Sequence, residues 1–252
     1  MDNLLKAVQN AKHDFLNFYK YPVDMPVSGK FDIPVLKGIR IKRASKLQTV
    51  AFDECHLIPA NERKNYIVHF YIYDYKFERV WTFLNKNTEF LKQFKAVISP
   101  DFSEYTDMPR AMCIWNAWRC NFVSWWWQNA GIKVIPSARW SDEKSYEYSW
   151  DGMPTGGCYA VSSKGNIIDD RQHEKHKNSK NNTDTLAETS SLFKRGFEEF
   201  VHNIKPEQVF WMGAVPVWLD KLAKDNDIEV IIPIQRKLYE ERLKKRKQVN
   251  SQ

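Results

Sequence analysis

The stretch PRAMCIWNAWRCNFVSWWWQNAGIKVIPSARW, residues 109–140, holds the pattern that decides the fold. Its first part, 109–130, has apolar side chains at helical spacing and starts with Pro109, a residue favoured at the first position of a helix. Gly131 then supplies a helix stop, and 132–140 is an apolar, β-branched run typical of a strand. The stretch therefore predicts a helix followed directly by a strand.

Five of the ten tryptophans lie in this helix. Because apolar residues cover most of its circumference, we expect the indoles to form core rather than an exposed stacking surface. Arg119 lies among them, and an unpaired guanidinium would be costly there. We therefore expect Arg119 to be mostly buried and paired with Asp74, Glu78 or Asp101.

The same alternation runs along the whole chain. The predicted strands cover 47–54, 66–74, 96–101, 132–140, 158–163, 208–213 and 228–234. The predicted helices cover 77–94, 109–130, 187–204, 216–226 and 236–247. Strands that alternate with helices imply crossovers and a mostly parallel sheet. We expect an α/β fold with a barrel-like (β/α) sheet, complete or incomplete, and an open doubly wound sheet is the alternative.

Length and composition favour one α/β domain over residues 1–252, because 252 residues with 43% hydrophobic content can bury one substantial core. The segment 169–185 has no apolar residue and is expected to be a mobile polar loop; its His173 and His176 make only a weak metal motif. The last stretch, 236–252, has seven lysines and arginines against two glutamates and predicts a basic C-terminal helix.

The location of the protein is suggested by three absences in the sequence. The four cysteines form no CxxC pair, and the first residues lack the apolar run of an export signal. No window of eighteen uninterrupted apolar residues occurs. We expect a protein of the host-cell cytoplasm that has no membrane partner.

Polar residues gather where the predicted strands end, which is where parallel α/β folds place their chemistry. The candidate catalytic residues are Asp74, Glu78 and Asp101, and the candidate substrate contacts are Ser103, Arg119, Arg139 and Trp140. Convergent carboxylates can hold a divalent cation, with Asp74 and Asp101 as its ligands, or act as an acid and base pair. They are also common turn and cap residues, so a structural role stays open. The cofactor is unknown, and a divalent cation is one candidate.

Four stretches carry a resemblance to a known family: HFYIYDYKFERVW (69–81), SPDFSEYTDMP (99–109), WWQNAGIKVIPSARW (126–140) and SYEYSWDGMP (145–154). Over roughly 47–215 the chain resembles a family of phages and other mobile elements that is known only as a domain of unknown function. The positions shared with that family are Asp74, Phe77, Glu78, Trp81, Pro100, Asp101, Ser103, Asn116, Arg119, Gly131, Pro136, Trp140, Ser145, Gly152 and Gly165. The resemblance implies a mobile-element setting and no particular mechanism.

Three hypotheses for the function follow. The first is an enzyme acting on nucleic acid or nucleotides through the acidic strand ends. The second is a non-catalytic nucleic-acid-binding accessory protein that uses 37–46 and the tail, above all Lys244, Lys245, Arg246 and Lys247. The third is a protein that binds and counteracts a host factor, which needs no sequence signature.

Overall fold

A computed structural model describes residues 24–42, 47–164 and 180–249 of the chain. All strands of the two larger sheets are parallel to their neighbours. The five-stranded sheet has the order β10 (Ile234–Arg236), β3 (Gln48–Ala51), β4 (Tyr66–His69), β5 (Ala96–Ile98), β6 (Val134–Ile135). The three-stranded sheet has the order β7 (Cys158–Ser162), β8 (Gln208–Met212), β9 (Glu229–Ile231). The predicted α/β fold with a mostly parallel sheet is confirmed.

The two sheets are joined at both of their edges. A parallel bridge pairs Ser137, just after β6, with Ala160 of β7. At the other edge β9 leads through only Ile232 and Pro233 into β10. A buried cluster contains residues from β4 to β9, including Ile67, Ile98, Ile135, Ala160, Phe210, Met212 and Ile231. Because residues of both sheets meet in this one cluster, the strands enclose a common interior and the sheet is barrel-like.

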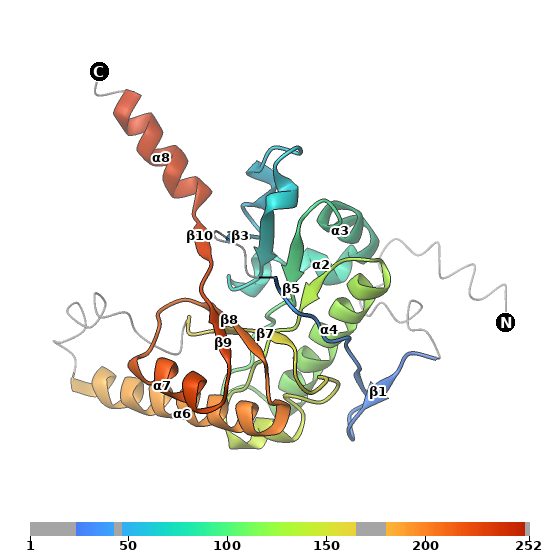
Figure 1. Ribbon diagram of the computed structural model, residues 1–252, viewed down its shortest axis with the longest axis vertical. Coiled ribbons are helices and arrows are strands. Elements are labelled where there is room, and N and C mark those ends of the chain that lie inside the picture. The colour runs from blue at the N-terminus through green and yellow to red at the C-terminus, as the bar shows by residue number, and fades with distance from the viewer. Residues whose placement is uncertain (1–23, 43–46, 165–179, 250–252) are drawn as a thin grey trace.

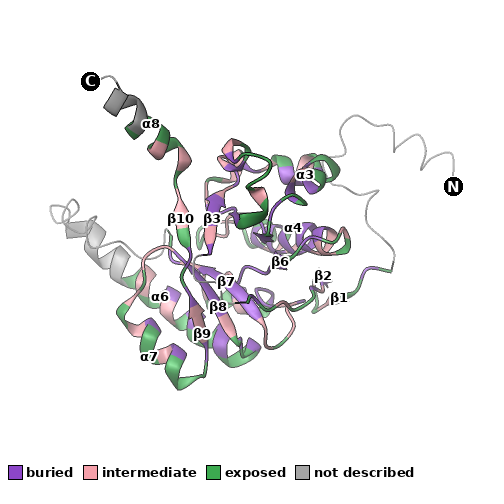
Figure 2. Cartoon of the chain, turned by 45° about the horizontal axis from the view of Figure 1, so that its top comes forward, coloured by how far each residue is buried: buried purple, intermediate pink, exposed green. Residues whose placement is uncertain are grey.

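Helices cover the outside of both sheets (Figure 1). On the five-stranded side these are α2 (Arg79–Thr82), α3 (Leu84–Leu91) and α4 (Arg110–Asn129). On the three-stranded side they are α6 (Lys180–Ile204) and α7 (Val217–Asp225). Each group shares a buried core with the outward-facing residues of its sheet. Figure 2 shows β7 as mostly buried, whereas β10 is intermediate and exposed.

Only one of the five indoles of helix α4 is fully buried, as expected for a core residue, and the other four are partly exposed. Trp127 is fully buried and stacks on Phe70 with the ring centroids 5.5 Å apart. Trp118, Trp125 and Trp126 pack only partly buried against the same core, and Trp115 is 37% exposed. Gly131 ends the helix with φ of +87°, a conformation that glycine adopts without strain.

Several elements differ from the sequence-based prediction. The predicted helix 77–94 is divided at Phe83, whose ψ of 54° breaks the helical path between α2 and α3. The predicted polar loop 169–185 is wrong from residue 180 onward, because α6 already begins at Lys180; the remaining residues lie outside the described part. A short antiparallel pair, β1 (Val27–Ser28) and β2 (Ile33–Pro34), was not predicted.

The basic C-terminal segment forms α8 (Leu238–Val249), as predicted, and begins two residues later than expected. Glu54 accepts a hydrogen bond from the backbone N–H of Leu238 at 2.6 Å and so caps its first turn. Beyond this anchor, α8 extends away from the rest of the chain (Figure 1).

Candidate active site at the carboxyl ends of the strands

A pocket of about 880 Å³ opens beyond the carboxyl ends of the strands. Its walls come from the segments after β4, β5, β6 and β7 and from α6. The polar and aromatic residues that line it include Tyr71, Tyr73, Lys76, Asp101, Ser103, Glu104, Tyr105, Asp107, Arg139, Trp140, Ser162 and Lys164. A (β/α) barrel brings these segments together because every parallel strand ends at the same rim.

Asp101 follows β5 and lies half-buried in this pocket. Burial raises the pKa of its carboxyl group to about 7; Arg139 and Lys164 oppose the shift, and the carboxylates of Asp74 and Glu104 add to it. No hydrogen bond or ion pair joins Asp101 to another residue in the part of the chain that the structure describes. Asp101 is therefore a carboxyl group that changes charge near neutral pH.

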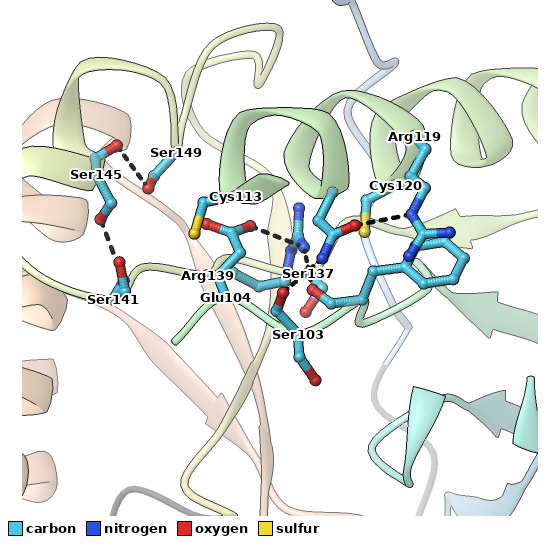
Figure 3. Close-up of polar contacts among 12 residues, drawn as sticks. Ser103, Glu104, Cys113, Arg119, Cys120, Ser137, Arg139, Ser141, Ser145 and Ser149 are labelled. Atoms are coloured by element: carbon cyan, nitrogen blue, oxygen red, sulfur yellow. Dashed lines mark hydrogen bonds and ion pairs between the residues drawn. The ribbon is translucent and has the colours of Figure 1, made fainter. Parts of the chain in front are cut away.

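Arg139 and Glu104 form an ion pair in the pocket wall, with Nη1 and Oε1 3.0 Å apart. The two side chains are only 10% and 4% exposed, so the pair is almost out of water. Arg139 also donates to the carbonyl of Phe102 at 3.2 Å, which ties β6 to the loop after β5. Arg139 Nε finds no acceptor among the described residues. Figure 3 shows this pair beside helix α4.

Tyr71 and Lys164 complete the polar floor of the pocket, and Ser137 contacts Tyr71 without lining the pocket itself. The Tyr71 hydroxyl and Ser137 Oγ are 2.9 Å apart, and burial raises the pKa of Tyr71. Lys164 Nζ donates to the carbonyl of Tyr71 at 3.4 Å. The pKa of Lys164 is lowered because its ammonium group is partly withdrawn from water and Lys237 repels it. A cation and an ionisable carboxyl group thus face the same cavity.

A second charged cluster lies next to the pocket, at the middle of α4. Arg119 Nη1 pairs with Glu78 Oε1 at 2.7 Å, and its Nε donates to Asn116 Oδ1 at 2.9 Å. The Arg119 side chain is 11% exposed, and its guanidinium lies 3.6 Å from the centroid of the Phe102 ring. The prediction that Arg119 is mostly buried and paired with a carboxylate is confirmed.

Asp74 continues this second cluster toward the loop after β5. Its two carboxylate oxygens accept hydrogen bonds from the backbone N–H of Ser103 at 3.0 Å and from Ser103 Oγ at 2.8 Å. The carbonyl of Ser103 in turn accepts from Asn116 Nδ2 at 2.6 Å. These contacts hold in place the segment that carries Asp101. Both carboxylate oxygens of Asp74 are already used as hydrogen-bond acceptors.

Trp140 forms a wall of the pocket by packing against α6. Its ring stacks on Phe193 with the centroids 5.2 Å apart. Gly196 makes this possible, because a Cβ atom at that position would come 2.2 Å from the indole. The indole N–H is buried without an acceptor in the described residues.

The structure divides the predicted site residues into two groups. Asp101, Ser103, Arg139 and Trp140 line the pocket. Asp74, Glu78 and Arg119 do not line it: Asp74 bonds to the lining residue Ser103, and Glu78 and Arg119 pair with each other. Their catalytic and binding roles stay predictions.

The basic tail lies apart from the pocket. Lys244 is exposed on α8, and the side chains of Lys245, Arg246 and Lys247 lie outside the described residues, as do the two histidines of the polar loop. The described residues contain no group of three or more His, Cys, Asp or Glu side chains that could hold a metal ion.

Sequence reasoning missed several pocket residues, among them Tyr71, Glu104 and Lys164. Tyr71 lies two residues after the last residue of β4, and Lys164 lies two residues after the last residue of β7. Because side chains alternate along a strand, both positions face the interior when the strand is extended past its end. The alternation of side chains along a strand was therefore the sequence signal that could have identified Tyr71 and Lys164.

Parallel strands in a barrel-like circuit with a polar pocket beyond their carboxyl ends define an α/β protein of a kind that often binds or converts small ligands. The chain belongs to a family described as Domain of unknown function (DUF4417), which it matches over residues 25–231. The family resemblance expected from the four motifs is therefore confirmed, over a longer stretch than expected.

Two phage proteins, each called Gene 1 protein, are similar to part of the chain. That of Mycobacterium phage L5 is 39% identical over 98 residues, and that of Mycobacterium phage D29 is 38% identical over 98 residues. The match covers 39% of this chain and 43% and 36% of these relatives, so it spans less than half of each. No solved structure matches the chain. Within the described residues, no helix has the length and apolar character needed to cross a membrane.

Proposed function

We propose that the pocket is an active site for acid–base chemistry on a nucleotide or on nucleic acid. The observation that carries the proposal is Asp101, a half-buried carboxyl group that has no hydrogen-bond or ion-pair partner among the described residues and whose pKa is raised to about 7. Such a group exists in both protonation states at neutral pH. It can therefore accept a proton from water or from a substrate hydroxyl and return it in a later step.

The surrounding charges fit an anionic substrate. Arg139 is already matched by Glu104, so its main role is to hold the wall of the pocket. Lys164 pairs with no carboxylate in the described part of the chain, and it is therefore the cation left to contact a phosphate oxygen. Trp140 offers an apolar wall, and the cavity of about 880 Å³ is within the range of small-ligand sites.

Acid–base chemistry is preferred to metal ligation by Asp74 and Asp101. Both oxygens of Asp74 already accept hydrogen bonds from Ser103, so a cation would have to displace them. Asp101 has no such bonds in the part of the chain that the structure describes, so it is available for proton transfer.

The test combines a titration with a binding measurement on the full chain. Carbon-13 NMR of the aspartate carboxyl groups should show one signal with a midpoint near 7, and Asp101→Asn should remove it. Calorimetry should show binding of a nucleoside monophosphate that Lys164→Ala weakens about tenfold, the loss of one charge-assisted contact. Asp220→Asn, an exposed site on α7, is the control. Midpoints near 4 for all aspartates, or no nucleotide binding at all, would refute the proposal.

A second candidate function is nucleic-acid binding by the tail. The observation in its favour is that α8 extends away from the body, with Lys244 exposed on it. Truncation after Glu241 keeps the Arg236–Glu241 pair, 2.6 Å between Nη2 and Oε2, so the fold should survive. If the tail makes about four phosphate contacts, duplex DNA affinity should fall on the order of a hundredfold between 50 and 200 mM salt, and the truncation should abolish binding. Equal binding by the truncated chain would exclude the tail.

A further inference from the structure

Two tyrosines beside the pocket are more exposed than their size predicts. Tyr73 and Tyr75 are 72% and 77% exposed, although large aromatic side chains usually gain free energy by burial. Their rings lie nearly parallel, with an interplanar angle of 12° and centroids 5.9 Å apart. Tyr73 also lines the pocket, so this pair of rings stands at its rim.

The backbone that carries the two rings is anchored on both sides. Asp74, between them, accepts two hydrogen bonds from Ser103. Lys76, directly after them, donates to Asp53 at 2.6 Å. The rings are therefore exposed on a fixed turn, the 3-10 helix Asp74–Lys76, rather than on a loose loop. A fixed aromatic surface loses little conformational entropy when a flat ligand stacks on it.

We propose that Tyr73 and Tyr75 stack a base of a single-stranded nucleic acid next to the nucleotide that occupies the pocket. The inference rests on the proposed function, because it extends the same site outward from its rim. Bases in a duplex are covered by their neighbours, whereas each base of a single strand offers a free face to an aromatic ring. Duplex DNA should therefore bind this rim much more weakly than a single strand.

The charges around the platform specify how such a strand binds. Lys76 is neutralised by Asp53, and Asp74 adds a negative charge, so the rim is not a basic patch. Lys164 is the cation expected to contact phosphate. Affinity should then come mainly from stacking, and its salt dependence should be shallow: about threefold between 50 and 200 mM for one phosphate contact on a single strand. This separates the rim from the tail, for which the expected change is on the order of a hundredfold.

The experiment measures fluorescence anisotropy of labelled 12-nucleotide oligothymidylate and of the matching duplex with the chain truncated after Glu241, which lacks most of the tail's positive charge. Tyr75→Ala should weaken single-strand binding about tenfold, and Tyr73→Ala should do the same, since base–aromatic stacking contributes about 1–3 kcal/mol per base. Tyr75→Phe should retain affinity because the ring remains. Phe83→Ala, at a 51% exposed aromatic residue away from the pocket lining, is the matched control.

The outcomes separate the two proposals. If thymidine monophosphate binds in a Lys164-dependent way but Tyr75→Ala leaves oligonucleotide affinity unchanged, the platform is wrong and the active-site proposal stands. If Tyr75→Phe weakens binding as much as Tyr75→Ala, stacking is not the mechanism. Equal affinity for duplex and single strand, or no oligonucleotide binding, would also overturn the inference, and a peptide or protein partner would then be the better occupant of the rim. Thermal unfolding should not change in the alanine variants, because both rings face solvent.

Discussion

Two clusters of charged residues meet at the loop after β5, and they differ in how far their hydrogen bonds are satisfied. The anchored cluster, next to the pocket, consists of Asp74, Glu78, Ser103, Asn116 and Arg119. The pocket cluster consists of Tyr71, Asp101, Glu104, Arg139 and Lys164. In the anchored cluster every member has a close partner. Over residues 24–42, 47–164 and 180–249, by contrast, Asp101 has no hydrogen-bond or ion-pair partner and Arg139 Nε lacks an acceptor.

The difference teaches which charged residues are free to act on a ligand. Buried polar groups normally find partners, so a satisfied network holds a fold together, and an exception needs an explanation. Here the exceptions face a cavity, and the pKa values of Asp101 and Lys164 shift in opposite directions, up for the acid and down for the base. Both shifts bring the groups closer to neutral pH, as acid–base chemistry requires.

The largest expected effect comes from breaking the anchored cluster. Glu78→Gln leaves the Arg119 guanidinium, 11% exposed, without its counter-charge and should lower the free energy of unfolding by about 2 kcal/mol. This is below the range for fully buried pairs because the Glu78 side chain is 43% exposed. Arg119→Met should cost less, since it removes the charge along with the pair. Urea unfolding measures both, and a larger loss for Arg119→Met would show that its contacts with Phe102 and Asn116 matter more than its charge.

Much of this fold could be predicted from the sequence, because the alternation of β-branched runs and helical periods is local information. All seven predicted strands overlap observed strands, with the run 228–234 divided into β9 and the start of β10. The two clusters could not be separated in this way. Asp74 and Asp101 both follow strands, and only the tertiary contacts show that Asp74 is bonded to Ser103 while Asp101 faces the cavity. Local sequence signals do not reveal side-chain partners that come from distant segments of the chain.

The next prediction is that the Asp101 carboxylate lowers the free energy of unfolding at neutral and alkaline pH. Its folded-state pKa of about 7 lies above the ordinary aspartate value of 3.8, so the folded state holds its proton more tightly than the unfolded state. Stability is therefore unaffected by this group below about pH 4, falls as the pH rises from 4 to 7, and stays reduced above 7. Asp101→Asn removes this dependence and should stabilise the protein by about 1–2 kcal/mol at pH 8, allowing for partial solvent screening.

Thermal or urea unfolding of wild type and Asp101→Asn at several pH values checks this expectation. The difference between the two proteins should grow from pH 4 to pH 7 and then remain constant. If Asp101→Asn instead destabilised the protein at pH 8, Asp101 would have a structural role like the residues of the anchored cluster. Removing the charge of a carboxylate that has a structural partner lowers the stability of the protein.

The smallest effect concerns Ser103, which belongs to the anchored cluster and also lines the pocket. Ser103→Ala removes the hydroxyl bond to Asp74 and keeps the backbone bond at 3.0 Å, so the free energy of unfolding should fall by only about 1 kcal/mol. Because the remaining bond still holds Asp74, the turn that carries Tyr73 and Tyr75 should stay in place and nucleotide binding should change less than twofold. Calorimetric nucleotide binding and urea unfolding of the same variant measure both quantities. If binding fell tenfold while the free energy of unfolding fell by about 1 kcal/mol, the Ser103 hydroxyl would be a ligand contact. Ser103 would then act in the pocket cluster as well as in the anchored cluster.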